Sequence, residues 1–354
     1  MSLNGKHILV MAGGTGGHVF PALAVAKMLA AQGAKITWLG TRRGLEATVV
    51  PENGFDIEFI SVEGLRGKGG AELVLAPFKL VRALWQSASV MRSIQPDCVI
   101  GFGGFVSGPG GLMSYVFRTP LIIHEQNSVA GLTNKWLAKL AKIVLTGFPD
   151  VLDLPKNARW VGNPVRSEIS SREEGKRKRL RVLVIGGSQG AHSFNMKLPK
   201  VFSDLGLELK IKHQAGRGKS KQVRALYDLH EIDAKVVEFI DDMAAAYQWS
   251  DLLVCRAGAM TIAECCAVGK PALLIPFPFS AGDHQIHNAM AMVDVGAGEM
   301  VLNHKLDSSE MVDTLVRLTS GRERLQSMGE CARTLYKPNA TEATTLAIKE
   351  VLDA

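Results

Sequence analysis

The sequence predicts an α/β protein of two Rossmann-like domains, each built on a parallel sheet, that face a central cleft. Short apolar runs alternate with longer amphipathic stretches along the whole chain, which is typical of βαβ units. Two glycine-rich turns, about half the chain apart, share one pattern. At 354 residues the chain exceeds the size at which one core keeps growing, and 47% apolar residues can fill two cores.

Each glycine turn follows a short apolar run and precedes a helical pattern. The first reads ILVMAGGTGGH over residues 8–18, and the second reads VLVIGGSQGA over residues 182–191. Glycine suits an abrupt change from strand to helix, because positive φ and close backbone approach exclude a Cβ. The helix that follows presents unpaired N–H groups, which attract an anion. Each domain is therefore predicted to hold a phosphate-bearing or sugar-like ligand at its turn.

Strands are expected wherever a short apolar run occurs. The runs cover residues 8–11, 36–39, 57–60, 98–100 and 121–123, and in the second half they lie near Val182, Leu209, Val236, Leu252 and Ala272. Pro164 and the basic run 172–181 place the boundary and hinge within residues 163–180. A last helix from about Glu342 to Leu352 could pack on either domain.

Composition and charge narrow the class of protein. The net charge of +7 fits phosphorylated substrates, anionic lipid or nucleic acid, but no recognisable nucleic-acid module is found. Five cysteines without CxxC spacing indicate reduced thiols in a cytosol, and neither a disulfide framework nor a zinc site. The chain runs straight into its first strand, so no signal peptide is expected.

The uncharged run at residues 98–117 is long enough to span a bilayer. It contains six glycines and Pro109, so a strand, a glycine-rich turn and a helix fit it better.

Two common nucleotide-binding motifs are absent. Neither glycine turn has the G-x-G-x-x-G spacing, and Arg42 and Arg43 stand where a ribose-binding acid would follow the second strand. Those arginines could suit a 2′-phosphate, but the loop spacing argues against an NADP enzyme. Gly218-Lys219-Ser220 lacks the first glycine of a phosphate loop.

A stronger signal lies at residues 251–264, which read as strand, glycine turn and helix. Thr261 and Glu264 fall on one face of that helix. Backbone amides around Ala259 to Thr261 could meet a diphosphate, while the Glu264 carboxylate could accept from two ribose hydroxyls. The alternative is an ordinary capped helix whose glutamate balances the helix dipole.

The proline-rich loop at residues 276–289 opens into a helix that begins with Asp283, His284 and Gln285. Several short polar groups at one place suit sugar hydroxyls. Metal ligation by His284 and His287 would need a neighbouring carboxylate pattern, which is missing.

Eight motifs occur in an order that covers nearly the whole chain: GGTGGHVFPALA (13–24), GFGGFVSGPGG (101–111), HEQNSVAGLTNKWLA (124–138), VGNPVR (161–166), GGSQGA (186–191), EFIDDMAAAY (238–247), RAGAMTIAE (256–264) and DHQIHNA (283–289). Together they resemble the MurG family of bacterial peptidoglycan enzymes. That family transfers N-acetylglucosamine from UDP-N-acetylglucosamine to lipid I, the undecaprenyl-diphosphate-muramyl-pentapeptide, and so makes lipid II.

The resemblance implies a GT-B fold. Residues 1–163 would form the acceptor-binding, membrane-facing domain, completed by a C-terminal helix over 340–354, and residues 164–339 would bind the sugar nucleotide. Residues 167–180 and 200–235 match none of the motifs.

The resemblance also implies residue roles. Arg166 and the Ile240 backbone would contact the uracil of the donor, and Glu264 would contact its ribose. The donor phosphates would meet Ser188, Met260 and Thr261. The donor sugar would be surrounded by Asn127, Ala259, His284 and Gln285, with Ile262 and Ala263 beside them. Thr15, Gly16 and Gly17 would line the junction with the acceptor, and Gly13, Gly14, Gly103, Gly104 and Ser107 would bind the acceptor itself.

The family inverts the anomeric carbon by single displacement, giving a β-1,4 linkage, so the acceptor hydroxyl needs a base. His18 and Glu125 are the candidates, with His18 first because imidazole titrates near working pH. No DxD pair follows a strand, since Asp241-Asp242 is expected to open a helix that ends near Trp249. We therefore expect neither a metal nor another cofactor, and stabilisation of the departing UDP by fixed donors.

Lipid I is membrane-anchored, so the enzyme is expected to sit peripherally on the cytoplasmic face of the cell membrane, with cell-wall synthesis and division proteins as candidate partners. Residues 73–85 mix large apolar side chains with Lys79 and Arg82 and could form a patch on an anionic membrane surface. A crossover helix buried on the sheet explains the same pattern.

Two rival functions share the predicted fold. A UDP-N-acetylglucosamine 2-epimerase would need acidic catalytic residues and no lipid-facing surface, and it would act without an acceptor. A non-catalytic sugar-nucleotide-binding subunit would usually need one domain, whereas the sequence predicts two.

Overall fold

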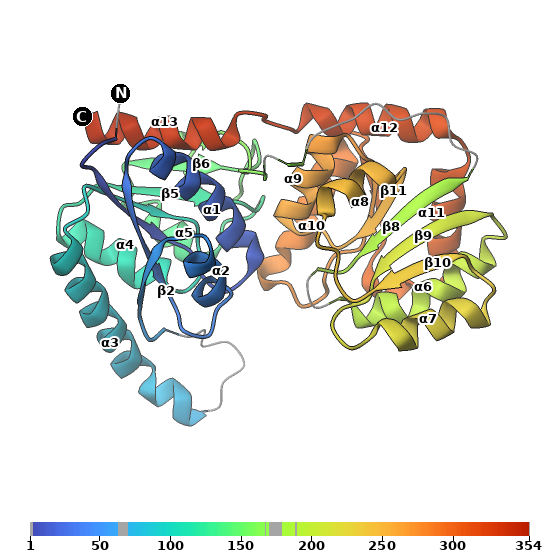
Figure 1. The fold of residues 1–354 in the computed structure, drawn as a ribbon, viewed down its shortest axis with the longest axis horizontal. Helices are drawn as coiled ribbons and strands as arrows, with labels where there is room; N and C mark the ends of the chain where they lie inside the picture. The colour runs from blue at the N-terminus through green and yellow to red at the C-terminus, as the bar shows by residue number, and fades with distance from the viewer. Residues whose placement is uncertain (1–2, 63–69, 167, 170–178, 188–189, 354) are drawn as a thin grey trace. The chain divides into compact units, whose positions relative to one another are not determined.

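The computed structural model describes residues 3–62, 70–166, 168–169, 179–187 and 190–353. The chain forms two compact units (Figure 1). Unit 1 comprises Met1–Arg166 and Lys337–Ala354, and unit 2 comprises Ser167–Tyr336. Each contains a parallel sheet covered by helices on both faces, which confirms the predicted fold class.

Unit 1 is built on a seven-stranded sheet with the order β3-β2-β1-β4-β5-β6-β7. Its strands are β1 (His7–Met11), β2 (Lys35–Gly40), β3 (Asp56–Phe59), β4 (Cys98–Gly101), β5 (Leu121–Glu125), β6 (Ile143–Thr146) and β7 (Arg159–Trp160). Its helices are α1 (Gly16–Ala31), α2 (Glu46–Glu52), α3 (Gly70–Ile94), α4 (Ser107–Val116), α5 (Leu132–Leu137) and α13 (Ala340–Asp353). The strand order reverses between β1 and β4, where α/β sheets bind ligands.

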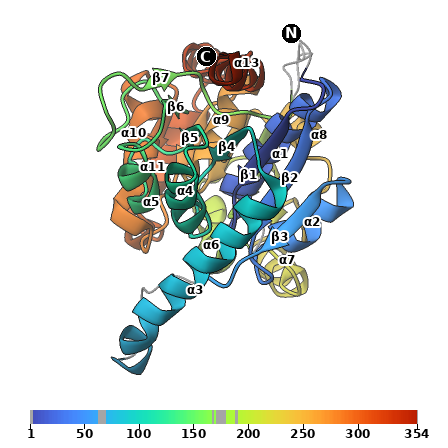
Figure 2. The same ribbon diagram turned by 90° about the vertical axis from the view of Figure 1, so that its left-hand side faces the viewer.

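Alternate side chains of the central strand enter two different cores. Ile8 and Val10 of β1 pack in a cluster that includes Ile348 of α13, while Leu9 and Met11 belong to the cluster on the other face. Strands buried on both faces read as continuous apolar runs, which is why the sequence marks them so clearly. The first turns of α3 extend beyond the other helices of unit 1 (Figure 2).

Unit 2 repeats the plan with a six-stranded sheet of order β10-β9-β8-β11-β12-β13. Its strands are β8 (Leu180–Ile185), β9 (Leu209–Gln214), β10 (Ala234–Val237), β11 (Leu252–Cys255), β12 (Ala272–Leu274) and β13 (Gly298–Met300). Its helices are α6 (His192–Asp204), α7 (Ser220–Leu229), α8 (Met243–Trp249), α9 (Ala259–Val268), α10 (His284–Asp294), α11 (Ser309–Thr319) and α12 (Arg322–Thr334), with short 3-10 turns at Ala281–Asp283 and Asn303–Lys305. Here the order reverses between β8 and β11.

Every strand expected from the sequence is present, and three more (β6, β7 and β13) are added. The uncharged run 98–117 forms β4, a glycine turn and α4. No helix among the described residues has the length and hydropathy to cross a membrane. Asp242 caps α8, its side chain accepting from the Ala245 N–H at 2.8 Å, as the sequence predicts for this acidic pair.

The units divide at 166–167 and 336–337, whereas the sequence placed the changeover at 163–164 and 339–340. Local contacts explain the three-residue difference at each end. Asn163 Nδ2 donates to the Gln126 carbonyl at 3.0 Å, and the Arg166 guanidinium lies over the Phe20 ring. The Lys337 ammonium lies 3.9 Å from the Trp160 ring centroid, which joins it to unit 1.

Candidate active site

The glycine turns after β1 and β4 touch at the point where the sheet order of unit 1 reverses. Gly103 and Gly104 have φ of +98° and +81°, and a Cβ on Gly104 would lie 2.5 Å from the Gly13 carbonyl oxygen. A Cβ on Gly103 would lie 3.0 Å from Cε1 of His18. Only glycine permits this approach, so the structure brings the predicted acceptor glycines and His18 together.

Glu46, a residue that the sequence did not single out, braces the first glycine turn. Its buried carboxylate accepts from the Gly14 N–H at 2.9 Å through Oε2. Its Oε1 accepts from the Thr41 N–H at 2.9 Å and from the Thr41 hydroxyl at 2.8 Å. The only sequence signal was an acidic residue in the first turn of a short helix, which ordinarily indicates a helix dipole contact.

Two predicted acceptor residues use their polar groups inside the protein. The Gly14 N–H is bonded to Glu46, and the buried Ser107 hydroxyl donates to the Gly103 carbonyl at 2.8 Å. Both groups therefore help to shape the turns, and the expected contacts of these two residues with the acceptor stay predictions. Helix starts remain for an anion: α1 and α4 begin without a side-chain cap, and Gly16 and Gly17 open α1 next to the exposed Thr15.

His18 ends a hydrogen-bond relay that begins in the core of unit 1. His124 Nε2 lies 2.9 Å from the Gly162 carbonyl oxygen, and Gln126 Nε2 lies 3.1 Å from His124 Nδ1 and 2.9 Å from the His124 carbonyl oxygen. Gln126 Oε1 then lies 2.8 Å from His18 Nδ1. Burial lowers the pKa of His124 from 6.5 to about 4, against the opposing effects of the Gly162 bond and Glu125, so its ring is neutral near pH 7.

The relay has one consistent set of protons. A carbonyl only accepts, so His124 Nε2 carries the proton and its Nδ1 accepts from the Gln126 amide. That orients Gln126 with Oε1 toward His18, and Oε1 also only accepts. Neutral His18 therefore carries its proton on Nδ1 and has a lone pair on Nε2, for which no partner is recorded within the described part of the chain.

Glu125, the second candidate base, is fully engaged. Its Oε1 accepts from the Asn127 backbone N–H and side-chain amide at 3.0 and 3.1 Å. Its Oε2 accepts from the Gly131 N–H at 3.1 Å and from Asn134 Nδ2 at 2.9 Å. The side chain is buried, so this carboxylate ties down the loop between β5 and α5.

In unit 2 a cavity of about 430 Å³ lies at the carboxyl ends of β8 and β11. The glycine turn after β8, the start of α9 and the start of α10 line it; among the lining residues are Gly186, Gly187, Gly190, Arg256, Gly258, Thr261 and Gln285. The start of α9 has no side-chain cap, since its N-cap residue is Gly258. Ser188, expected at the phosphates, lies outside the described residues.

Arg256 provides a fixed positive charge in this cavity. Its Nη1 donates to the Ile275 and Pro276 carbonyls at 3.0 and 3.1 Å, and its Nη2 donates to the Ser193 hydroxyl at 3.0 Å. The guanidinium lies 4.4 Å from the Phe194 ring centroid. Burial lowers the pKa of Arg256 from 12.5 to about 10, which leaves it charged near pH 7.

Gln214 joins the glycine turn after β8 to the segment around Ile240, which is expected to bind the uracil of the donor. Its Nε2 donates to the Gly187 carbonyl and its Oε1 accepts from the Ile240 N–H, both at 2.9 Å. Because the Ile240 N–H is already bonded, a contact with uracil at Ile240 would have to use its carbonyl oxygen. Gln214 was not found from sequence, because nothing local marks a residue at a strand end as a link between two loops.

The Glu264 carboxylate is held by the buried Tyr247, whose hydroxyl donates to Oε2 at 2.7 Å. Thr261 and Glu264 are both half-buried on α9, whereas the Ile262 side chain is buried in the core, so Ile262 can offer a ligand only its backbone. Met260 and Ala263 are half-buried and Ala259 is buried. Tyr247 ends the motif at residues 238–247, but its contact with Glu264 could be recognised only from the fold.

The start of α10 carries the predicted sugar contacts. Gln285 Oε1 accepts from the Phe277 N–H at 2.9 Å, which ties α10 to the proline-rich loop, and His284 beside it is half-buried. Asp283 has φ of +52°, a left-handed conformation that the turn requires. Across the ranges that the structure describes, no three His, Cys, Asp or Glu side chains are grouped so as to hold a metal ion.

The site residues predicted from sequence therefore fall into two groups, one in each unit. Unit 1 holds His18, Glu125, Asn127, Arg166 and the acceptor glycines, and unit 2 holds Ile240, the α9 residues and the α10 pair. Two parallel α/β units, each with an uncapped helix start at its switch point, are the arrangement of the GT-B fold class.

Comparison with known proteins gives the family. Residues 8–146 match the Glycosyltransferase family 28 N-terminal domain, and residues 181–349 match the Glycosyltransferase family 28 C-terminal domain. The UDP-N-acetylglucosamine--N-acetylmuramyl-(pentapeptide) pyrophosphoryl-undecaprenol N-acetylglucosamine transferase of Hahella chejuensis is 46% identical over 347 residues, covering 96% of each chain. The enzyme of the same name from Alkalilimnicola ehrlichii is 47% identical over 348 residues, covering 96% of this chain and 97% of its own. The chain belongs to the MurG family.

Solved structures agree with this assignment. The crystal structure of Acinetobacter baumannii MurG superposes with a TM-score of 0.85 at 37% identity, covering 98% of this chain and 99% of that one. The UDP-GlcNAc 2-epimerase of Neisseria meningitidis has a TM-score of 0.66 at 10% identity, covering 98% of this chain and 100% of that one. That second likeness shows the fold alone, and the epimerase alternative is not favoured.

Proposed function

We propose that this enzyme transfers N-acetylglucosamine from UDP-N-acetylglucosamine to the C4 hydroxyl of lipid I, with inversion at the anomeric carbon, and so makes lipid II. The observation that carries the residue assignment is the His18–Gln126 contact of 2.8 Å, which leaves Nε2 as the basic nitrogen. The family to which the chain belongs supports the substrate pair.

His18 is the general base. Its Nε2 takes the proton of the acceptor hydroxyl as that oxygen attacks the anomeric carbon, and the bond between this carbon and the UDP oxygen breaks. The charge that develops on the ring is stabilised through Nδ1–H by the Gln126 carbonyl oxygen. A positioned base of this kind typically contributes about a hundred- to ten-thousand-fold in rate.

Glu125 serves as a positioning residue. All of its principal acceptor directions are used by the Asn127, Gly131 and Asn134 donors, and its burial keeps it from a substrate. Taking up a proton would break at least one of these four hydrogen bonds. Its function is to hold the loop that begins with Gln126, and so to hold the relay to His18.

The donor phosphates are assigned to the cavity of unit 2. One helix start contributes only about 0.3 to 2 kcal/mol toward an anion, so the amides at the start of α9 need help. Hydrogen bonds to charged oxygens add roughly 1.5 to 3 kcal/mol each, and Thr261 and the cationic Arg256 stand at the same cavity. Glu264, oriented by Tyr247, accepts from the ribose hydroxyls.

The acceptor diphosphate is assigned to the starts of α1 and α4. Both helices begin at the touching glycine turns, and neither start is occupied by a capping side chain. In this assignment the lipid-linked sugar lies beside His18, whose ring is close to Gly103. The site takes its shape from backbone, which suits a diphosphate that must approach closely.

Helix α3 is the proposed contact with an anionic membrane surface. Its apolar patch, defined as Leu75, Phe78, Leu80, Val81 and Trp85, is exposed, with Phe78 at 72% and Trp85 at 69%. Ala83, Val90 and Met91 on the same helix are buried, so the helix packs on the sheet through a different face. Exposed apolar side chains beside Lys79 and Arg82 suit peripheral binding at the cytoplasmic face of a membrane.

The deciding experiment incubates the enzyme with labelled UDP-N-acetylglucosamine and a short-chain lipid I analogue. The proposal expects a β-1,4-linked disaccharide product and one UDP released for each transfer. UDP release with free sugar in the absence of acceptor would instead indicate an epimerase-like enzyme.

A further inference from the structure

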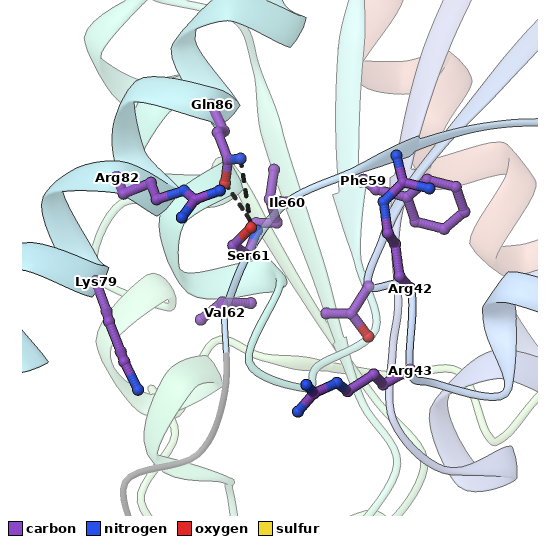
Figure 3. A pocket seen from close by; sticks show the side chains of 10 residues that line it. Arg42, Arg43, Phe59, Ile60, Ser61, Val62, Lys79, Arg82 and Gln86 are labelled. Carbon is purple, nitrogen blue, oxygen red and sulfur yellow. Dashed lines mark hydrogen bonds between the residues drawn. The ribbon is translucent and has the colours of Figure 1, made fainter. Parts of the chain in front are cut away.

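A second cavity in unit 1, of about 490 Å³, lies outside the site described above. It opens between the segments that follow β2 and β3 and the side of α3 (Figure 3). Arg42 and Arg43 line it from the loop after β2, and Lys79 and Arg82 line it from α3. The proposed function assigns no role to Arg42 and Arg43, whereas Lys79 and Arg82 also flank the α3 patch that is proposed to contact the membrane.

Four of the described residues that line the cavity are basic. No acidic side chain lines it within the described part of the chain, and no ion pair is recorded there for Arg42, Lys79 or Arg82. The Arg42 guanidinium lies 4.8 Å from the Phe59 ring centroid. Gln86 of α3 accepts from the Ser61 N–H at 2.7 Å, which fixes the helix to the segment after β3. A concentration of cationic side chains attracts an anionic ligand.

We propose that this cavity binds the carboxylates of the pentapeptide stem of the acceptor, an inference that rests on the proposed function. The names of the curated relatives include an N-acetylmuramyl-(pentapeptide) group, and a peptide joined to a sugar through its amino end has a free carboxyl terminus. Arginine presents donors in a planar fork that matches a carboxylate. The two arginines after β2 are therefore suited to this group.

The position of the cavity fits the reach of such a peptide. Thr41, which lines the cavity, bonds to Oε1 of Glu46, while Oε2 of the same carboxylate bonds to the Gly14 N–H. One carboxylate thus separates the cavity edge from the glycine turn of the proposed acceptor site. Five extended residues span at most about 17 Å, which is ample for that separation.

A phosphate group of a membrane lipid is the competing occupant. Two features favour the peptide. The cavity lies at the carboxyl ends of β2 and β3, the edge where α/β sheets place substrates. Its volume of about 490 Å³ falls in the range of pockets for small molecules and exceeds the need of one phosphate group.

The test compares steady-state kinetics of the full-length enzyme and its R42Q/R43Q variant in detergent, without vesicles. The acceptors are a short-chain lipid I analogue with the free pentapeptide and the same analogue with every carboxylate amidated. The variant is expected to raise KM for the free-acid acceptor about tenfold or more, and to leave KM for the amidated acceptor and for UDP-N-acetylglucosamine within about twofold. Lys156→Gln, an exposed lysine of unit 1 outside the cavity, is the matched control.

Each other outcome overturns the inference in a distinguishable way. Equal KM values of variant and wild type for the free-acid acceptor would exclude the peptide. Unchanged acceptor KM together with lost binding to phosphatidylglycerol vesicles would assign the cavity to lipid headgroups. Absence of transfer by the wild type with either acceptor would contradict the proposed function itself.

Discussion

His18 Nδ1 lies 2.8 Å from Gln126 Oε1, and this contact determines which nitrogen of His18 can take a proton. Gln126 cannot rotate its amide without losing its bonds to both the ring and the carbonyl of His124. His124 in turn is fixed by the Gly162 carbonyl and by its own burial. The tautomer of neutral His18 is thus set by a neutral histidine two hydrogen bonds away.

Gln126→Leu tests the relay. The variant loses the acceptor for Nδ1–H, so the tautomer with a basic Nε2 is no longer favoured, and kcat is expected to fall about tenfold to a hundredfold. KM for UDP-N-acetylglucosamine is expected to stay within about twofold, since Gln126 makes no proposed donor contact.

Gln126→Glu is expected to shift the pH dependence of kcat/KM, which would not change if Gln126 had only a structural role. Its carboxylate accepts from Nδ1–H and stabilises the protonated ring, so the acid limb of the kcat/KM profile is expected to move to higher pH. Full kcat in Gln126→Leu, with an unmoved profile in Gln126→Glu, would show that the relay has no part in catalysis.

His18→Ala and Glu125→Gln are expected to fail in different ways. Loss of the base is expected to lower kcat by about a hundred- to ten-thousand-fold with little change in Tm. Glu125→Gln instead turns an amide toward donors that need an acceptor, which is expected to cost about 1 to 3 kcal/mol of stability. Its folded fraction is expected to keep kcat within about tenfold, because Glu125 touches no reacting atom.

Thermal melts and single-turnover assays separate these two losses. A stable Glu125→Gln enzyme without turnover, beside an active His18→Ala enzyme, would reverse the assignment of the base.

Tyr247→Phe examines the donor site without touching the donor. The variant removes the hydroxyl that donates to Glu264 Oε2 at 2.7 Å, so Glu264 loses its fixed orientation. KM for UDP-N-acetylglucosamine is expected to rise about threefold to tenfold in Tyr247→Phe, and further in Glu264→Ala, which loses both ribose bonds. Glu330→Ala, an exposed glutamate on α12, is the control.

Direct binding of UDP by calorimetry checks the same point independently of turnover. Equal affinities in Glu264→Ala and the control would remove Glu264 from the ribose site.

Substitutions in the exposed apolar patch on α3 are expected to change membrane binding and to leave stability and transfer unchanged. Phe78→Ser with Trp85→Ser is expected to abolish most sedimentation with phosphatidylglycerol vesicles, because both side chains are largely exposed and contribute little to the core. Tm and kcat with a short-chain acceptor in detergent are expected to match the wild type. Retained vesicle binding in this variant would place the membrane contact on another surface.

How far the sequence predicts the fold depends on strand burial. Strands such as β1 and β8 are covered on both faces and therefore consist of apolar runs that are visible without a structure. In contrast, β7 is only Arg159–Trp160, and β13 includes Glu299, whose carboxylate pairs with Arg317 on the surface. Elements this short carry too little pattern to be recognised.

The same distinction applies to the candidate site. Glycine turns and helix starts are local, so His18, Thr261 and Glu264 could be singled out from spacing and resemblance. The supporting groups depend on pairs far apart in sequence: Gln126 lies 108 residues from His18, and Glu46 lies 32 residues from Gly14. The four donors to Glu125 likewise became visible only in the fold.

Acid is expected to destabilise both units through buried histidines. Burial lowers the pKa of His124 in unit 1 to about 4 and that of His213 in unit 2 to about 3, both from 6.5. Between these values and 6.5 the unfolded chain binds more protons than the folded one, so the free energy of unfolding falls as pH decreases. At about pH 5 the loss is about 2 kcal/mol for each histidine.

His213→Gln isolates the effect in unit 2. It removes the titrating ring, so the difference in unfolding free energy between about pH 7.5 and about pH 5 is expected to shrink by about 2 kcal/mol relative to the wild type. Any cost of losing the contact with the Tyr227 hydroxyl at 3.0 Å is present at both pH values and cancels in this comparison. Urea unfolding of this variant and of His304→Gln, an exposed control on the same unit, measures the difference. An unchanged pH dependence in His213→Gln would mean that His213 takes up its proton equally well in the folded and unfolded chains.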